Sequence, residues 1–395
     1  MYRIKGRIQH YAWGGKTFIA NLLGHDNKEK LPYAEYWLGV HPGGVSEVDL
    51  GDGAKTNLNA LLVSDRKRYL GPPVLLHFTS LPFLLKVLDV EQMLSIQVHP
   101  TIEAAVKGFA KENELGIPLD AANRNYKDQN HKPEIMVALS EFWLLHGFAN
   151  DVATRLKTYP ILHSFAAAYE KGGLASLYSS IMNAPQHEVE AILKPLAERI
   201  VLSYQRGELK KENPDFWAAR ALIHAPDGQQ YDRGIFSIYL FNIVKLMPGQ
   251  GIFQGAGMPH AYLEGQNIEL MSNSDNVLRA GLTPKYIDIP ELLLNTQFVE
   301  TAPQVLQGNL NDMEVYYPSQ VSDFGIRYFH LQKGETLSLN DPSPTIVLVL
   351  EGKGNWKGGK SITTDGFSSF YTLPMEAIEG RAELEMRGVI ARVGI

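Results

Sequence analysis

The chain of 395 residues contains no cysteine. This absence excludes disulfide bonds, thiolate metal ligands and cysteine nucleophiles, and it suits the cytoplasm, where we expect the protein to work. An excess of basic residues is also missing: the formal net charge is −6, which gives no reason to expect nucleic-acid binding. Apolar runs long enough to cross a bilayer are absent, and the N-terminal stretch "MYRIKGRIQHYAWGGK" has no apolar signal-peptide core. We therefore expect no membrane association.

The residues that are present predict a mainly β protein of three domains. Residues 1–100 carry short β-branched and aromatic runs between glycine and proline, and β character returns after the helical stretch, from residue 242 onward. Residues 151–240 show the 3.6-residue periodicity of helices, and we expect a helical domain there. Residues 301–395 return to short apolar runs and predict a second β domain, of the sandwich or barrel type.

Two local elements can be expected near the centre of the first β domain. A helix should follow Pro100, because Thr101 can cap its first turn. Four apolar residues share one face of that helix: Ile102, Ala105, Val106 and Phe109. A strand should run through "IMVALSEFWLLHGF", directly after residue 134.

The stretch "SIQVHP" places Gln97 and His99 two residues apart. On a strand both side chains would point to the same face, because successive side chains alternate. An imidazole and an amide oxygen on one face could share a metal ion. For such a pair taken alone, the simpler interpretation is a histidine hydrogen-bonded within a polar surface.

The stretch "YKDQNHKPEI" places many ionisable groups directly before an apolar strand. Glu134 is the last charged residue before that strand, so its carboxylate should lie at the rim of the core, where it needs a cation or strong donors. Pro133 restricts Lys132 to an extended conformation. A salt bridge between Lys132 and Glu134 is the alternative, but it leaves the neighbouring His131 and Asn130 without a role.

A second histidine follows in "GAGMPHAYLEG". Gly255 and Gly257 predict a turn, Pro259 restricts the chain, and His260 is expected to begin the next strand. The pattern resembles the second metal motif of cupin barrels, although Gly255 stands where that motif usually has proline. Two histidines, one glutamate and one glutamine make a mixed nitrogen and oxygen set that suits Zn²⁺, Mn²⁺ or Fe²⁺.

A polar turn and two basic residues lie in "IELMSNSDNVLRAGLTPKYID". The turn consists of Asn273, Ser274, Asp275 and Asn276. A solvated loop is the simple interpretation of such a stretch. However, Gly281, Thr283 and Pro284 would hold Arg279 and Lys285 at fixed positions, and arginine binds phosphate in a forked geometry. The loop therefore suits an anionic substrate.

Together these stretches resemble the type I mannose-6-phosphate isomerases, and the bacterial members in particular. The matching stretches are "YAWGG", "AEYWLGVHPGG", "PFLLKVLDVEQMLSIQVHP", "YKDQNHKPE" and "PHAYLEGQNIELMSNSDNVLRAGLTPKYID". They span residues 11–290 in the family's order and spacing. Asp89 stands where the family often has cysteine, and Ser272 where it usually has alanine, but neither is a matched functional position.

The resemblance implies cupin, or jelly-roll, barrels with a helical subdomain, in which residues 1–150 and 241–300 form the catalytic cupin domain and residues 301–395 a second, cupin-like one. It implies one zinc ion per chain, held by Gln97, His99, Glu134 and His260. It also implies that Arg279 is an active-site residue. The residues implied to line the same cleft are Trp13, Lys132, Tyr262, Asp275 and Lys285. The expected phosphate contacts are Ser95 and Lys285.

The implied reaction interconverts mannose 6-phosphate and fructose 6-phosphate through a cis-enediol, with a proton moved between C2 and C1. The negative oxygen of that intermediate needs a Lewis acid, which a metal supplies, and a cation such as Lys132 or Arg279. The residues do not select a base, for which His131, Asp275, Glu134 and Lys132 are the candidates. The expected partner is a phosphorylated hexose, and the chain is expected to act as a monomer.

Two other functions fit parts of the pattern. His99, His260 and Glu134 could form the iron triad of an oxygenase, although the Gln97 ligand and the basic loop argue against it. A sugar-binding regulator without activity is the second alternative, and the complete ligand set argues against it. Metal analysis and oxygen consumption test the first alternative, and turnover by purified protein tests the second.

Overall fold

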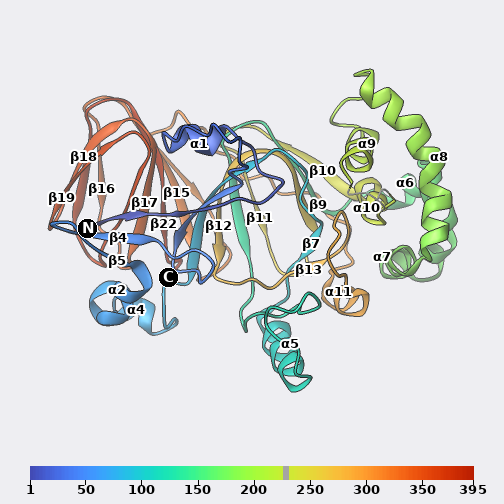
Figure 1. Ribbon diagram of the computed structural model, residues 1–395, viewed down its shortest axis with the longest axis horizontal. Coiled ribbons are helices and arrows are strands. Elements are labelled where there is room, and N and C mark those ends of the chain that lie inside the picture. The colour runs from blue at the N-terminus through green and yellow to red at the C-terminus, as the bar shows by residue number, and fades with distance from the viewer. Residues whose placement is uncertain (226–230) are drawn as a thin grey trace.

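Three antiparallel sheets and a group of helices follow one another along the long axis of the molecule (Figure 1). The computed structural model describes residues 1–225 and 231–395. In this part of the chain a four-stranded sheet lies at one end, an eight-stranded sheet follows, and helices cover the far side of a ten-stranded sheet. The antiparallel pairing confirms the expected mainly β class with helices inserted.

The ten-stranded sheet is organised around one long strand, β12, which pairs with β6 and β7 along one edge and with β8 and β9 along the other. Its strands are β2 (Arg7–Gln9), β3 (Glu35–Gly39), β6 (Phe83–Val90), β7 (Gln97–Val98), β8 (Glu134–Ala138), β9 (Phe142–Phe148), β10 (Phe241–Leu246), β11 (Gly251–Gln254), β12 (His260–Ser272) and β13 (Leu278–Arg279).

The strand expected after residue 134 is interrupted by a bend at residues 139–141, which separates β8 from β9. Both parts still pair along β12. The bend lies opposite Gly265, whose φ is +126°, and a Cβ at this glycine would lie 2.6 Å from the carbonyl oxygen of Glu141. The hydroxyl of Ser140 accepts a hydrogen bond from the backbone N–H of Gln266. These contacts explain why the apolar run forms two strands.

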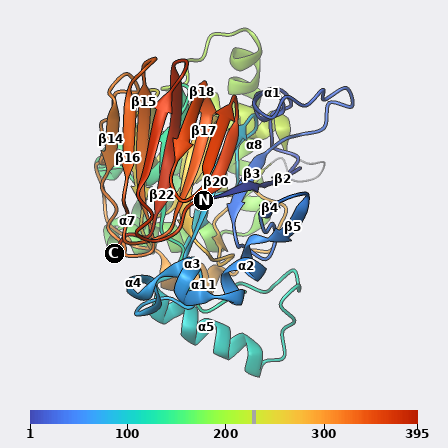
Figure 2. The same ribbon diagram turned by 90° about the vertical axis from the view of Figure 1, so that its left-hand side faces the viewer.

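The eight-stranded sheet combines strands from both ends of the chain (Figure 2). Its strands are β1 (Tyr2–Lys5), β4 (Glu47–Gly51), β5 (Ala54–Asn57), β14 (Glu314–Tyr317), β15 (Gly325–Leu331), β17 (Thr345–Glu351), β20 (Ser368–Tyr371) and β22 (Met386–Arg392). β1 lies between β20 and β4. The expected domain boundaries stay predictions, and this pairing joins the first and last of the expected domains within one sheet.

The middle sheet is buried on both faces. Ile346 and Leu348 of β17 pack into the core shared with the ten-stranded sheet, and Val347 and Val349 pack into the core shared with the four-stranded sheet. Alternating side chains on a doubly covered strand require the uninterrupted apolar run "TIVLVL". The four-stranded sheet consists of β16 (Thr336–Leu339), β18 (Lys353–Lys357), β19 (Ser361–Asp365) and β21 (Ile378–Ala382).

The helical block packs on the ten-stranded sheet through a large apolar core, in which Trp143 and Phe148 of β9 meet Tyr178 and Trp217 of the helices. Its helices are α6 (Val152–Thr158), η1 (Pro160–Phe165), α7 (Ala166–Asn183), α8 (Gln186–Gln205), α9 (Pro214–His224) and α10 (Gly234–Leu240). Among the described helices, none combines the length and hydropathy that crossing a bilayer needs.

The helix expected after Pro100 is α5 (Ile102–Glu114), and the Thr101 hydroxyl accepts the N–H of Ala104 as its cap. The expected apolar face is wrong in part, because Ile102 and Val106 are each 44% exposed. The buried face consists of Ala105, Gly108 and Glu112. Gly108 meets the ring of Tyr126, so this helix packs on a loop beside the site. The remaining helices are α1 (Phe18–Leu22), α2 (Leu58–Ser64), α3 (Arg66–Leu70), α4 (Pro72–Leu75) and α11 (Ile289–Asn295).

Candidate active site

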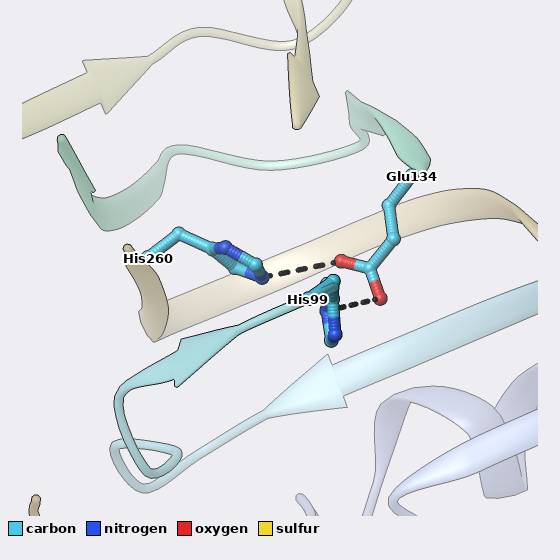
Figure 3. Close-up of side chains that lie close together, drawn as sticks. All are labelled: His99, Glu134 and His260. Atoms are coloured by element: carbon cyan, nitrogen blue, oxygen red, sulfur yellow. Dashed lines mark ion pairs between the residues drawn. The ribbon is translucent and has the colours of Figure 1, made fainter. Parts of the chain in front are cut away.

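Three buried side chains converge at the ends of strands in the ten-stranded sheet (Figure 3). His99 follows β7, Glu134 begins β8, one residue before the expected start of that strand, and His260 begins β12 as expected. The Nε2 atoms of His99 and His260 each lie 3.3 Å from one oxygen of the Glu134 carboxylate. One ligand atom from each residue lies within 4.8 Å of the others. The structure thus brings together three of the four expected metal ligands as one compact set.

The hydrogen bonds on the far side of the two imidazoles fix which nitrogen carries a proton. Nδ1 of His99 donates to the carbonyl oxygen of Asn276 at 2.9 Å, and Nδ1 of His260 donates to that of Met258 at 2.9 Å. Both Nε2 atoms therefore present lone pairs to Glu134. Nε2 of His99 has no hydrogen-bond partner despite its 3.3 Å approach to the carboxylate. Lone pairs that converge in this way fit a divalent cation between them.

The charge states of these side chains also favour binding of a divalent cation. Burial lowers the pKa of His99 to about 4, so its imidazole is neutral near pH 7. Burial would raise the pKa of Glu134, but the ammonium of Lys132, 3.2 Å away, and the two imidazoles hold it well below its usual value. The salt bridge considered as an alternative is therefore present, and Glu134 also faces both histidines. A neutral imidazole at His99 beside an anionic carboxylate at Glu134 provides ligands in the protonation states that a metal requires.

The fourth expected ligand, Gln97, lies on the same cavity as Glu134 and His260. It is opposite His260 in the pairing of β7 with β12 and opposite Arg279 in the pairing with β13. Three other expected residues line this cavity too: Ser95, Lys132 and Tyr262. Six of the twelve residues predicted from separate stretches therefore line one cavity.

The cavity also has a buried ion-pair network that the sequence did not predict. Nζ of Lys86 lies 2.9 Å from Glu269 and 3.4 Å from Glu35, and all three line the cavity. Burial alone would lower the pKa of Lys86, but the two carboxylates raise it above its usual value. The hydroxyl of Tyr262 donates to Glu269 at 2.8 Å and is committed to this network. A lysine within the apolar strand "FLLKVLDV" was the available signal.

Hydrogen bonds between the two polar stretches hold the ligands in place. The side chain of Asn276 accepts from the backbone N–H groups of Lys127 and Asp128, and it donates to the carbonyl oxygen of Asn130. The hydroxyl of Ser274 donates to Asp128. A solvated loop, the simple interpretation of this turn, is therefore wrong, because its polar groups join two loops. The carbonyl oxygen of Asn276 also orients His99.

Three cations are grouped near the end of β13: Arg279 ends this strand, Lys285 lies on the loop that follows, and Lys127 comes from the stretch before β8. Burial, together with the charges of Arg279 and Lys127, lowers the pKa of Lys285, and burial lowers the pKa of Arg279. In the described part of the chain, no carboxylate offsets these effects. Neighbouring cations without an acidic partner favour binding of an anion. Lys127 was not predicted, although it lies within "YKDQNHKPEI".

Six of the twelve expected site residues do not line the cavity that holds Glu134: His99, Arg279, Lys285, His131, Asp275 and Trp13. The last three have other partners. Nε2 of His131 lies 3.1 Å from Asp323, between β14 and β15. Asp275 lies 3.3 Å from His41. The ring of Trp13 packs on the apolar cluster that contains Tyr262. Their expected roles stay predictions.

His146 is expected to make the stability of the protein depend on pH. Burial, with a smaller effect from His260, lowers the pKa of His146 from 6.5 to about 4. Between these values the unfolded chain binds a proton that the folded chain excludes. The free energy of unfolding should therefore be highest above pH 6.5 and fall as the pH falls towards 4, by roughly 3 kcal/mol for this group.

Chemical denaturation of metal-free protein across this pH range measures the effect. The variant His146→Gln should show a shallower fall than the parent protein. An equal fall in both proteins would show that His146 does not contribute to the pH dependence.

Comparisons with known proteins agree with this geometry. The family model "Phosphomannose isomerase type I, catalytic domain" matches residues 1–150. The mannose-6-phosphate isomerase of Escherichia coli (strain K12) is 39% identical over 403 residues, which cover 100% of this chain and 99% of that protein. The protein of the same name from Salmonella typhimurium is 40% identical over 363 residues, covering 89% of both.

Solved structures extend the likeness to the whole chain. The mannose 6-phosphate isomerase of Salmonella typhimurium bound to fructose 6-phosphate and zinc has a TM-score of 0.85 at 32% identity and covers 100% of both chains. A single-residue variant of phosphomannose isomerase from the same organism has a TM-score of 0.88 at 32% identity, again over 100% of both chains.

Proposed function

The chain belongs to the type I phosphomannose isomerases, and we propose on that basis that it interconverts mannose 6-phosphate and fructose 6-phosphate at the cavity around Glu134. The observation that carries this proposal is the buried set of His99, Glu134 and His260, whose lone pairs converge. The related mannose 6-phosphate isomerase of Salmonella typhimurium binds fructose 6-phosphate and zinc.

Zinc is the cofactor of this site. Gln97, His99, Glu134 and His260 would hold it, which supplies two nitrogen and two oxygen ligands. When bound, zinc supplies a Lewis acid that polarises the substrate oxygens. The hydrogen bonds from Nδ1 of the two imidazoles keep both Nε2 atoms available as ligands.

The chain's own residues account for proton transfer between C2 and C1. A proton acceptor must reach the bound sugar, and among the expected candidates Lys132 lines the cavity whereas His131 and Asp275 do not. Glu134 is committed to the ligand set. We therefore assign proton transfer to Lys132, whose ammonium must first release a proton to solvent before its amine can accept one from C2 or C1. Stabilisation of the negative enediol oxygen is assigned to Arg279, which lies opposite Gln97.

The phosphate group is expected at the cations beyond β13. The charges of Arg279 and Lys127 both lower the pKa of Lys285, and a dianion would relieve this repulsion. Ser95, two residues before Gln97 in the sequence, also lines the cavity and would add a hydroxyl donor to the phosphate. The sugar would therefore lie with its carbonyl end towards Glu134 and its phosphate towards Lys285.

Replacing Lys285 by alanine should raise KM for the phosphorylated sugar by about tenfold or more, with a much smaller change in kcat, because phosphate binding acts largely on ground state and transition state alike. Steady-state kinetics would measure both constants. Lys107→Ala on α5 is a matched control and should leave KM unchanged. An unchanged KM in Lys285→Ala would show that the phosphate is held elsewhere.

Turnover of mannose 6-phosphate by purified protein tests the function directly. Fructose 6-phosphate should accumulate to equilibrium, and a chelator should stop the reaction. Binding without turnover would indicate a sugar-binding regulator, and oxygen consumption with bound iron would indicate an oxygenase. Either result would overturn the proposal.

We also propose the cupin fold and the domain division that the family resemblance implies. The motif around His260 and the antiparallel sheets support a catalytic cupin barrel in residues 1–150 and 241–300, followed by a helical domain in residues 151–240 and a cupin-like domain in residues 301–395. Catalytic groups at strand ends of one sheet and a helical block behind it fit this division, whereas β1, β4 and β5 of residues 1–150 lie in the sheet of the last domain.

A further inference from the structure

Asp232 lies outside the cavity around Glu134, two residues before α10 begins. It contacts the loop that carries Lys285. Its Oδ1 accepts the backbone N–H of Gly234 at 2.6 Å and that of Leu282 at 2.8 Å. Its Oδ2 accepts the N–H of Thr283 at 3.3 Å. One carboxylate from the helical block therefore binds two consecutive N–H groups of a loop about fifty positions away in the sequence.

The loop needs such a clamp because its backbone is strained there. Leu282 has a φ of +55°, a conformation that residues with a side chain rarely adopt. Gly281 has a φ of +122°, and a Cβ on it would lie 2.4 Å from the Cα of Gly234. The two glycines therefore let the loop and the start of α10 touch backbone to backbone. The interactions of Asp232 offset the cost of this conformation.

The clamp lies between the two basic residues of the site. Arg279 is held separately, because Ala280 and Gly281 exchange backbone hydrogen bonds with Ile96. Lys285 lacks that support on its side of the loop, and its N–H donates to the hydroxyl of Thr283 at 3.2 Å. Removing the clamp should therefore displace Lys285 more than Arg279.

We propose that Asp232 is a positioning residue, through which the helical block holds Lys285 in place for the substrate phosphate. It does not touch the substrate itself. This inference rests on the proposed function, since it assumes that the anion at Lys285 is the phosphate of the sugar. It assigns the helical block a role in substrate affinity as well as in packing.

The variant Asp232→Ser tests this role. A serine hydroxyl can still accept the N–H two residues on at Gly234, but it is too short to reach the loop. KM for mannose 6-phosphate should rise about tenfold, kcat should fall less, and competitive inhibition by inorganic phosphate should weaken by a similar factor. Asp232→Asn keeps an oxygen acceptor for Gly234 and Leu282 and should recover most of the loss.

A matched control separates positioning from general stability. Asn213 caps α9 by accepting the N–H of Asp215 at 2.9 Å, within the same helical block. Asn213→Ala should lower the melting temperature yet leave KM and phosphate inhibition unchanged. Equal KM effects in both variants, or parent-like KM and phosphate inhibition in Asp232→Ser, would overturn the inference. Failure of the parent protein to turn over mannose 6-phosphate would instead refute the proposed function.

Discussion

Replacing His99 by alanine is expected to remove zinc and activity together. Its Nε2 is one of the two buried nitrogen lone pairs that face Glu134, and neutral imidazole is the form a metal binds. Removing a residue that only hydrogen-bonds to a metal ligand typically lowers metal affinity or activity by about 10–100-fold. Removing one of four proposed ligands should cost more, so we expect kcat to fall by more than about a hundredfold. Metal content and turnover would be measured on the same preparation.

His146→Gln is the control for this prediction. His146 is also a buried histidine of the ten-stranded sheet and lies opposite His260. Unlike Nε2 of His99, however, Nε2 of His146 donates to a carbonyl oxygen, that of Phe253. This variant should retain one zinc per chain and most of its activity. Full activity of His99→Ala without metal would refute the zinc assignment.

Replacing Arg279 by lysine is expected to preserve the fold and the metal but to lower kcat by about 10²–10³, the usual cost of one preorganised donor. Arg279 lies on β13 opposite Gln97, the fourth proposed ligand, and burial lowers the pKa of Arg279. Lysine retains the charge but cannot reproduce the planar fork of the guanidinium. The measurement is steady-state kinetics, together with metal content and a thermal melt.

An exposed arginine supplies the comparison. Arg199 pairs with Asp215 in the helical block, 61% of its side chain is exposed, and Arg199→Lys should leave kcat unchanged. If Arg279→Lys also turned over at the parent rate, Arg279 would be a peripheral charge. Stabilisation of the enediol oxygen would then pass to Lys132.

Features set by neighbouring residues were predictable from the sequence. Thr101 caps α5, Glu134 begins β8 and His260 begins β12, because capping, alternation and turn residues act over a few positions. The mainly β class followed from the same local patterns. The motifs also identified the histidines and the carboxylate that converge in the structure.

Features that depend on distant partners were not predictable in the same way. The apolar spacing of α5 suggested a buried face at Ile102, but the helix instead packs Gly108 on Tyr126. Lys86 reads as a lone charge in a strand until β12 places Glu269 opposite it. Asp232 meets Leu282 only because the helical block folds back on the sheet. Long-range contacts of this kind leave no local periodicity.

The most direct test of the account is a zinc titration of metal-free protein, followed by the rate of conversion of mannose 6-phosphate to fructose 6-phosphate. The rate should rise in proportion to added zinc and reach its maximum at one equivalent per chain, because His99, Glu134 and His260 form a single set of metal ligands. Full activity before any metal is added, or no activity at saturating zinc, would contradict it.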